Sequence, residues 1–273
     1  MSEDDPATGR RFLSRSAYAD DRNLRSRQAI FRYAEGQADP RWRTSAVPWN
    51  GTQLVADIGC GNGFDLRQLV PQGRCRHAIG VDLSPGMLGT LADLRGSGRL
   101  SLIQADAQRL PLAGGRADVA LAMHMLYHVP DIPAAVAELR RIVRPGGTVL
   151  VSTNSSGSLA EINDLLAGAI SRQLGRAMPR GLALSFTTEN GAQYLTRAFA
   201  DVTLQRADLP LAIPGPEPVI GYLDSMRAPI VASLGPSLDF DAVLEDAGAQ
   251  VEQAVREQDR FRAVFRTGVF VCR

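Results

Sequence analysis

Short apolar runs alternate with amphipathic segments through the middle of the chain. The runs are four to seven residues long, as buried strands are, and the segments between them repeat apolar positions with the period of a helix. Strands that alternate with helices predict an α/β fold with a parallel sheet covered on both faces. The expected strands are Leu54–Asp57, His77–Asp82, Leu100–Gln104, Ala117–Met123 and Thr148–Thr153.

The segment before the first strand predicts a helix over residues 18–33. Asp20 or Asp21 would cap it, since a short acidic side chain can accept a hydrogen bond from the first turn. Apolar residues fall on one side of this helix and arginines on the other. Two interpretations follow. Either the arginines form a solvated face, or the segment lies across the mouth of a site with Tyr18 and Arg27 facing a ligand.

The alternation becomes looser after Asn154, where insertions on the ligand side of such a sheet could roof a pocket. The expected elements are a helix within residues 157–185, a helix from Phe186 to about Phe199, a strand over Val202–Leu209, a loop over Pro210–Pro218, a short helix over Tyr222–Met226, a helix from Phe240 and a last strand over Phe261–Cys272. We expect an N-terminal helical cap over residues 1–50, a cofactor-binding core over 51–155, and a substrate cap with the end of the sheet over 156–273.

A glycine-rich turn follows the first strand, with Gly59, Gly61 and Gly63 at alternate positions. Glycine takes positive φ and lets a ligand approach the backbone, and the N–H groups that open the next helix favour an anionic group. Dinucleotide binders place the third glycine one residue later, where this chain has phenylalanine. A ligand with a carboxylate and an ammonium but no phosphate would suit a turn that carries Asp57 and Asn62. A purely structural turn is the alternative.

Each of the first three strands ends at an acid: Asp57, Asp82 and Asp106. The carboxyl ends of parallel strands meet at one edge of a sheet, so these acids should surround one crevice. Asp82 stands 19 residues beyond Gly63, where it could accept both hydroxyls of a ribose. Asp106 could accept a hydrogen bond from the exocyclic amine of adenine. The ligand should therefore contain a nucleoside, with Met87 either against the purine or in the core.

Two of the three histidines, His124 and His128, follow the fourth strand, with Tyr127 between them. Their spacing of four residues occurs in zinc sites, but the required glutamate and a third ligand are missing, so we predict no metal. His124, at the tip of the strand, is the better candidate for a group that faces a substrate. His128 could instead bond to the backbone.

Composition narrows the class of protein. A formal charge of +1 gives no argument for nucleic acid or an anionic membrane surface, and no apolar run is long enough to span a bilayer. Three cysteines without metal-ligand spacing, and an acidic start unlike a signal peptide, predict free thiols in the cytoplasm. All 30 basic residues are arginine, which excludes Schiff-base chemistry on lysine.

Together these motifs resemble class I S-adenosylmethionine-dependent methyltransferases of the small-molecule kind called methyltransferase type 11. The resemblance is close over Gln53–Thr153, and it is the order and spacing of the motifs that make it specific. It implies a doubly wound, Rossmann-like sheet of seven strands with the last strand antiparallel. The motifs are Val55-Ala-Asp-Ile-Gly-Cys-Gly-Asn-Gly, Gly80-Val-Asp-Leu-Ser-Pro-Gly-Met, Ala105-Asp-Ala-Gln-Arg-Leu-Pro, His124–Pro130 and Leu139-Arg-Arg-Ile-Val-Arg-Pro-Gly-Gly.

The resemblance implies S-adenosylmethionine as cofactor and S-adenosylhomocysteine as product, without a metal. It assigns the three glycines to the methionine part, Asp57 to the ammonium group and Asp82 to the ribose. Asp106 with Ala107 would bind adenine, and the end of the fourth strand would face the sulfonium. The cofactor-binding residues expected are Asp57, Gly59, Gly61, Asn62, Gly63, Asp82, Leu83, Met87, Asp106, Ala107, Met123 and His124.

Methyl transfer is an in-line displacement, so alignment supplies much of the catalysis. Candidate bases are His124, His128 and Tyr127, with Tyr18 as a positioning group. The expected acceptor is an oxygen, nitrogen or carbon of a small, partly apolar molecule, and the lysine-free composition is typical of bacteria rich in secondary metabolism. Assembly into a homo-oligomer stays open.

Two other classes of function remain. An NAD(P)-dependent oxidoreductase is one, although the position of the third glycine argues against it. The other is a noncatalytic module that keeps the S-adenosylmethionine site but transfers no methyl group.

Overall fold

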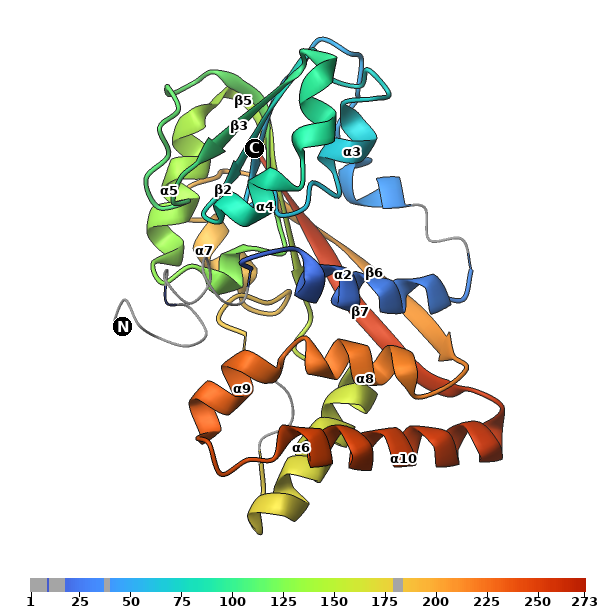
Figure 1. The fold of residues 1–273 in the computed structure, drawn as a ribbon. Coiled ribbons are helices and arrows are strands. Elements are labelled where there is room, and N and C mark those ends of the chain that lie inside the picture. The colour runs from blue at the N-terminus through green and yellow to red at the C-terminus, as the bar shows by residue number, and fades with distance from the viewer. Residues whose placement is uncertain (1–8, 10–17, 37–39, 179–183) are drawn as a thin grey trace.

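The computed structural model describes residues 9, 18–36, 40–178 and 184–273, which contain one seven-stranded sheet (Figure 1). The strand order is β3-β2-β1-β4-β5-β7-β6. The first five strands run parallel, and β7 is antiparallel to both β5 and β6. The predicted fold, with an antiparallel last strand, is therefore confirmed. The strands are β1 (Leu54–Ile58), β2 (His77–Asp82), β3 (Leu100–Gln104), β4 (Ala117–Met123), β5 (Val143–Asn154), β6 (Val202–Ile213) and β7 (Phe261–Cys272).

The central strands β1 and β4 are apolar except for one aspartate each because both faces of the sheet are covered. Ala120 and Ala122 of β4 pack in one cluster with α5 and α7, whereas Val119 and Leu121 pack in another with α3 and α4. Successive side chains of a strand point to opposite faces, so an unbroken apolar run is what a doubly covered strand needs. These helices are α3 (Leu66–Leu69), α4 (Pro85–Gly89), α5 (Ile132–Ile142) and α7 (Gly191–Leu195).

A second group of helices lies beyond one end of the sheet (Figure 1). Their buried residues form a separate cluster that also holds Ile30, just after α2, and Leu211 of β6. Figure 1 shows α2 crossing between this group and the sheet, in line with its contacts to α8. The group comprises α6 (Ala160–Leu174), α8 (Glu217–Asp224), α9 (Arg227–Leu234) and α10 (Phe240–Gln258), while α2 spans Arg22–Ala29.

The N-terminal helix is shorter than predicted. It begins at Arg22, so Tyr18 precedes it, and a 3₁₀ turn over Ile30–Tyr33 continues it. Asp21 holds the N-cap position but its side chain makes no capping bond; it pairs with Arg25 at 2.5 Å instead. Two other helices are capped by side chains, since Ser84 accepts from the Met87 amide and Asp131 accepts from the Ala134 amide.

Strand β6 runs four residues further than predicted, through Pro210 to Ile213. The expectation of a loop from Pro210 was wrong because β6 is the edge strand. The carbonyl of Pro210 faces outward and accepts from the Glu35 amide at 2.7 Å, so its ring nitrogen also faces away from β7. A proline at that position removes no ladder bond.

Other boundaries after Asn154 also differ from the prediction. The short helix expected around Tyr222–Met226 corresponds to α8, which begins earlier, at Glu217, and ends at Asp224; a second helix, α9, follows from Arg227. The helix expected from Phe186 is reduced to α7, and β5 starts at Val143, earlier than expected. Part of the segment expected within 157–185 forms α6, and residues 179–183 lie outside the described residues.

Candidate functional site

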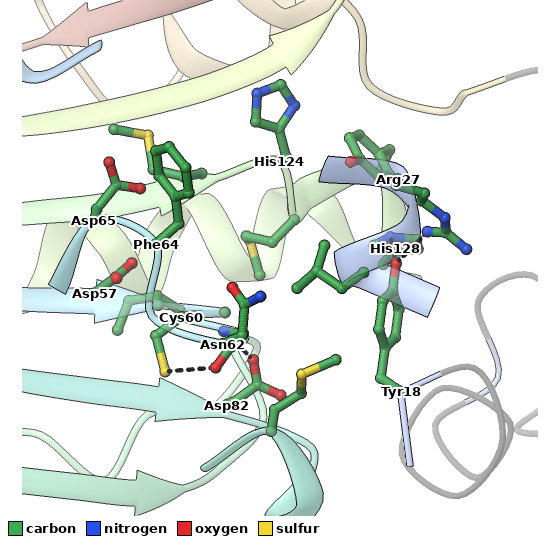
Figure 2. A pocket seen from close by; sticks show the side chains of 18 of the residues that line it. Tyr18, Arg27, Asp57, Cys60, Asn62, Phe64, Asp65, Asp82, His124 and His128 are labelled. Atoms are coloured by element: carbon green, nitrogen blue, oxygen red, sulfur yellow. Dashed lines mark hydrogen bonds between the residues drawn. The ribbon is translucent and has the colours of Figure 1, made fainter. Parts of the chain in front are cut away.

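A cavity of about 510 Å³ opens at the carboxyl ends of the parallel strands, against α2 (Figure 2). This edge is where doubly wound sheets bind ligands, and the volume is usual for a small-molecule site. Every residue predicted for the site lines this cavity except Gly63. The lining set includes Tyr18, Asp57, Gly59, Gly61, Asn62, Asp82, Leu83, Met87, Asp106, Ala107, Met123, His124, Tyr127 and His128.

The turn after β1 brings bare backbone to the cavity wall. Gly59 and Gly61 have φ values of +70° and +53°, in the left-handed region that favours glycine. A Cβ at Gly59 would also lie 2.7 Å from the Cβ of Met125. Both conformation and packing therefore exclude a side chain at Gly59, and the backbone stays accessible to a ligand.

Gly63 serves the packing of the core. Its φ is +73°, and a Cβ there would lie 2.3 Å from Cδ2 of Leu91, which is fully buried. Gly63 does not line the cavity, and its backbone conformation and its contact with Leu91 are sufficient to require a glycine at this position.

Asp82 ties the glycine turn to the end of β2. Its Oδ2 accepts from the Gly61 amide at 2.8 Å, and its Oδ1 accepts from the Ser84 amide at 2.9 Å. Burial raises the pKa of Asp82, although the backbone N–H groups of Ser84, Gly61 and Leu83 lower it. The carboxylate is thus held in one orientation at the cavity wall, where two oxygen atoms can accept further hydrogen bonds.

A buried charge cluster forms the far end of the site. Asp57 is 2% and Asp65 is 6% exposed, and Arg43 forms an ion pair with Asp65. Burial raises the pKa of Asp57 well above its usual value, the charge of Asp65 raises it further, and Arg43 opposes both. Two carboxyl groups share a single guanidinium there, so the cluster can accept one more cation.

Asp106 and Met87 have partners of their own in the structure. Oδ1 of Asp106 accepts from the backbone amide of Gln108 at 2.8 Å and both carboxylate oxygens lie 3.0 Å from Nε2 of that residue. Met87 is 1% exposed, so it belongs to the core while it lines the cavity. The two interpretations of Met87 are therefore compatible.

His124 stands where β4 ends, in a strained backbone conformation. Its φ is +54°, which is uncommon for a residue with a side chain, and its amide donates to the backbone and the side chain of Ser152. Burial lowers the pKa of His124 to about 3, with a smaller contribution from Arg43. The imidazole is therefore neutral at physiological pH and can line a wall beside a cation.

His128 is joined to the N-terminal segment by a hydrogen bond. The hydroxyl of Tyr18 lies 2.9 Å from Nε2 of His128, and Nη1 of Arg27 donates to the same hydroxyl at 2.9 Å. Because a guanidinium only donates, the Tyr18 oxygen accepts from Arg27 and its own hydrogen can go to His128. Of the two interpretations of the N-terminal segment, the one that places Tyr18 and Arg27 at the cavity is the one the structure shows.

Tyr127 is a poor proton acceptor in this setting. Its ring packs edge-on to His128 with centroids 4.6 Å apart. Burial raises the pKa of the Tyr127 hydroxyl far above its usual value. The phenol therefore stays protonated and can only donate a hydrogen bond or shape the wall.

Several lining residues were missed by the sequence analysis. Arg43 and Asn154 each place a buried polar atom, Nε and Oδ1, that has no hydrogen-bond partner among the described residues. Gln28 exchanges hydrogen bonds with Asn62, and the guanidinium of Arg43 lies 4.7 Å from the ring centre of Phe64. Of these residues, only Asn154 could have been identified from the sequence, because it directly follows a predicted strand.

The described residues contain no cluster of three metal-ligating side chains, and no described helix is long and apolar enough to cross a membrane. Cys60, Cys75 and Cys272 are free thiols and all are buried. Burial, with the charges of Asp57 and Asp82, raises the pKa of Cys60 well above its usual value. A thiolate nucleophile at the glycine turn is therefore disfavoured.

Comparison with known proteins finds a family match in the middle of the chain. Residues 56–151 match the family described as methyltransferase domain. The malonyl-acyl-carrier-protein O-methyltransferase of Serratia marcescens is 36% identical over 114 residues, which cover 42% of this chain and 43% of that protein. The ubiquinone biosynthesis O-methyltransferase of Methylococcus capsulatus is 39% identical over 130 residues, or 46% and 53% of the two chains. The chain thus spans about half the length of these relatives.

Solved structures share the fold at low identity. The phosphoethanolamine N-methyltransferase 2 of Haemonchus contortus, in complex with S-adenosyl-L-methionine, aligns with a TM-score of 0.57 and 18% identity, over 96% of this chain and 59% of that one. The cyclase SpnF aligns with a TM-score of 0.55 and 17% identity, over 93% of each chain. Since the fold serves a methyltransferase and a cyclase, the fold by itself does not fix the activity.

Proposed function

We propose that this protein, whose residues 56–151 match the methyltransferase domain family, transfers a methyl group from S-adenosylmethionine to an oxygen, nitrogen or carbon of a small, partly apolar acceptor. The observation that carries this proposal is the charge pattern of the cavity. Acids stand at the ends of β1 and β2, and Arg43, whose buried Nε has no hydrogen-bond partner within the described part of the chain, interacts with the first of them.

Each polar part of S-adenosylmethionine has a complementary residue in this charge pattern. The ammonium group would supply a cation for Asp57, since Arg43 is already paired with Asp65, and the carboxylate would accept from Nε of Arg43. Asp82 would accept from the ribose hydroxyls, and Asp106 with Ala107 would border the adenine. When bound, S-adenosylmethionine supplies a methyl group on a positively charged sulfur, and a neutral His124 can border that charge without repelling it.

The remaining wall would hold the acceptor. It is largely aromatic, since the rings of Phe31 and Phe265 lie 4.5 Å apart and the His124 ring lies 6.3 Å from Phe265. Oδ1 of Asn154, which no described residue hydrogen-bonds, would accept a hydrogen bond from an O–H or N–H group of the acceptor. Such a wall supports a small acceptor with an apolar body and at least one polar group.

A proton released by the acceptor has a route in the structure. Tyr18 could take it at its hydroxyl oxygen while its own hydrogen passes to Nε2 of His128, 2.9 Å away. His128 would then carry the positive charge as an imidazolium, and Tyr18 would be regenerated as a neutral phenol. This assigns His128 the role of base and Tyr18 that of relay. His124, whose pKa is about 3, and Tyr127 would only shape the site.

Calorimetry and mass spectrometry test the proposal. We expect S-adenosylhomocysteine to bind and NADH not to bind, which separates a methyltransferase from an oxidoreductase. Incubation with S-adenosylmethionine and a panel of phenols, amines and prenylated indoles should then give at least one product heavier by one methyl group. Binding without any methylated product would favour the noncatalytic module, and failure to bind S-adenosylhomocysteine would refute the proposal.

The raised pKa of Asp57 predicts a pH dependence of cofactor binding. An ammonium group beside Asp57 favours its ionised form, so binding lowers its pKa and releases a proton. Affinity for S-adenosylhomocysteine should therefore fall as pH decreases below the raised pKa of the free protein, by up to about tenfold per unit. Calorimetry between pH 5 and 7 in two buffers of different ionisation enthalpy measures both effects. The variant Asp57→Asn should bind more weakly and lose the proton release; a retained release would assign the proton to another group.

We further propose cytoplasmic location and a role in bacterial secondary metabolism. The support is compositional: a lysine-free chain with 30 arginines and free, buried thiols. The methylated product identified above would test the second statement directly.

A further inference from the structure

Arg27 is a cation in the cavity whose hydrogen-bond partners among the described residues are all neutral. Its Nε donates to Ser225 Oγ at 3.0 Å, its Nη2 to the Ser225 carbonyl at 2.9 Å and its Nη1 to the Tyr18 hydroxyl at 2.9 Å. A guanidinium has about five N–H donors, so these three bonds leave two. No carboxylate is within ion-pair distance of Arg27 among the described residues, which is unusual for a guanidinium removed from bulk solvent.

The acids of the cavity lie elsewhere. Asp57, Asp65, Asp82 and Asp106 follow β1, β2 and β3, at the proposed cofactor end. Figure 2 shows Asp57 and Asp65 on one side of the cavity and Arg27, with Tyr18 and His128, on the other. The cavity therefore has an acidic end and a separate cationic position.

The charge of Arg27 is maintained by its surroundings. Burial lowers the pKa of Arg27, but the hydroxyls of Tyr18, Tyr222 and Tyr127 outweigh burial and raise the pKa above its usual value. The surface that Arg27 leaves accessible is part of the cavity wall. A ligand in the cavity can thus reach a permanent positive charge.

The neighbours of Arg27 are apolar or aromatic. Phe31 follows on the same N-terminal segment and stacks at a tilt on Phe265, while Leu209 and Tyr222 complete this part of the wall. A charge at the border of an aromatic compartment is suited to a molecule that has an apolar body and one charged end.

We propose that Arg27 is the anion-binding residue of the acceptor subsite, and that the acceptor carries a carboxylate or another ionised acidic group on an apolar body. The two remaining N–H groups of Arg27 would donate to this anion, which would supply the counter-charge that the described part of the chain does not. The proposal rests on the proposed function in that it takes this half of the cavity as the acceptor subsite.

Paired probes test the preference for an anion. Calorimetry on the full chain, with S-adenosylhomocysteine at saturation, compares benzoate with benzamide, indole-3-acetate with indole-3-acetamide and 4-hydroxyphenylacetate with its amide. Each pair differs in charge but hardly in shape. At least one acid should bind about tenfold or more tightly than its amide, since a hydrogen bond to a charged group contributes more than one to a neutral group.

Substitutions then assign the preference to Arg27. In Arg27→Gln the acid-to-amide ratio should fall to about one, whereas a purely structural loss would weaken acid and amide equally. Arg27→Lys keeps the charge and should still prefer the acid over its amide, by a smaller ratio. This variant replaces Arg27→Gln in the test if the glutamine variant does not fold. The control is Arg32→Gln, an exposed arginine of the same segment outside the cavity lining, which should leave the ratio unchanged.

The outcomes separate this inference from the proposed function. If S-adenosylhomocysteine does not bind, the proposed function fails, and the acid-to-amide ratio is then measured without it. If S-adenosylhomocysteine binds but no acid in the panel is preferred over its amide, the proposal for Arg27 is wrong while the function stands. A preference that survives in Arg27→Gln would also overturn it.

Discussion

Replacement of Asp82 by alanine should weaken S-adenosylhomocysteine binding by about 100-fold or more. The carboxylate would accept from two ribose hydroxyls, and a hydrogen bond to a charged group contributes about 1.5 kcal/mol or more, so losing two corresponds to this factor. Alanine would also leave the amides of Gly61 and Ser84 without their acceptor, which would loosen the glycine turn. Calorimetry with S-adenosylhomocysteine measures the change in dissociation constant.

Two further variants separate the contributions. Asp82→Asn keeps the shape and one acceptor oxygen, so it should hold the turn better than alanine and still lose much of the ribose interaction. Asp93→Ala removes an exposed acid whose partner is Arg67, outside the cavity, and should leave binding unchanged. Unchanged affinity in Asp82→Ala would refute the ribose assignment.

The parallel part of the fold was predictable because its signals are local. Ala117–Met123 is apolar at every position except Asp118, and only a strand covered on both faces has that requirement. The strand-end acids were predictable for a related reason, since parallel strands bring their carboxyl ends to one edge and therefore bring Asp57 and Asp82 together. The positions of the strands and acids along the chain are therefore enough to place these acids together, and no tertiary contact has to be known.

The acceptor half of the site could not be predicted in this way. It depends on contacts between distant segments: Tyr18 with His128 across 110 residues and Arg27 with Ser225 across 198. Arg27 is one of 30 arginines, and nothing local distinguishes it from Arg25 or Arg32, which are exposed. Its importance follows from its partners being neutral, which only the folded arrangement reveals.

The motif correctly indicates that Gly63 must be a glycine, but the structure gives a different reason for it. The motif assigned it to the ligand with Gly59 and Gly61, and all three do have positive φ. The third glycine, however, is required by Leu91 rather than by the cavity. A sequence pattern records that a side chain is excluded at a position, and it does not record what excludes it.

This difference predicts that Gly63→Ala will primarily destabilise the fold. A positive φ costs alanine about 1 kcal/mol, and forcing a methyl group into a close-packed core costs about 1–3 kcal/mol, so the free energy of unfolding should fall by about 2–4 kcal/mol. That is a large part of the roughly 5–15 kcal/mol that holds a typical domain together. Thermal unfolding should show a midpoint lower by about 10 °C.

Two other glycines separate the causes of that loss. Gly98 has φ of +64° with nothing within 4 Å of an added Cβ, so Gly98→Ala should show the conformational cost alone. Gly89, in α4, has neither a positive φ nor a close neighbour, so Gly89→Ala should be neutral or slightly stabilising. Equal losses in Gly63→Ala and Gly98→Ala would mean that Leu91 yields easily and that packing does not explain Gly63.

A double-mutant cycle with Leu91→Ala tests the contact itself. Leu91→Ala alone removes a fully buried side chain and should cost about 2–5 kcal/mol. In the presence of Gly63→Ala the same change also makes space for the new methyl group, so the double variant should be more stable than the sum of the single losses by about 1 kcal/mol or more. Folded Gly63→Ala should still bind S-adenosylhomocysteine within a few-fold of the wild type. If Gly63 instead contacted the methionine part of the cofactor, the losses of stability in the two single variants would be additive. Gly63→Ala would then lose S-adenosylhomocysteine binding selectively.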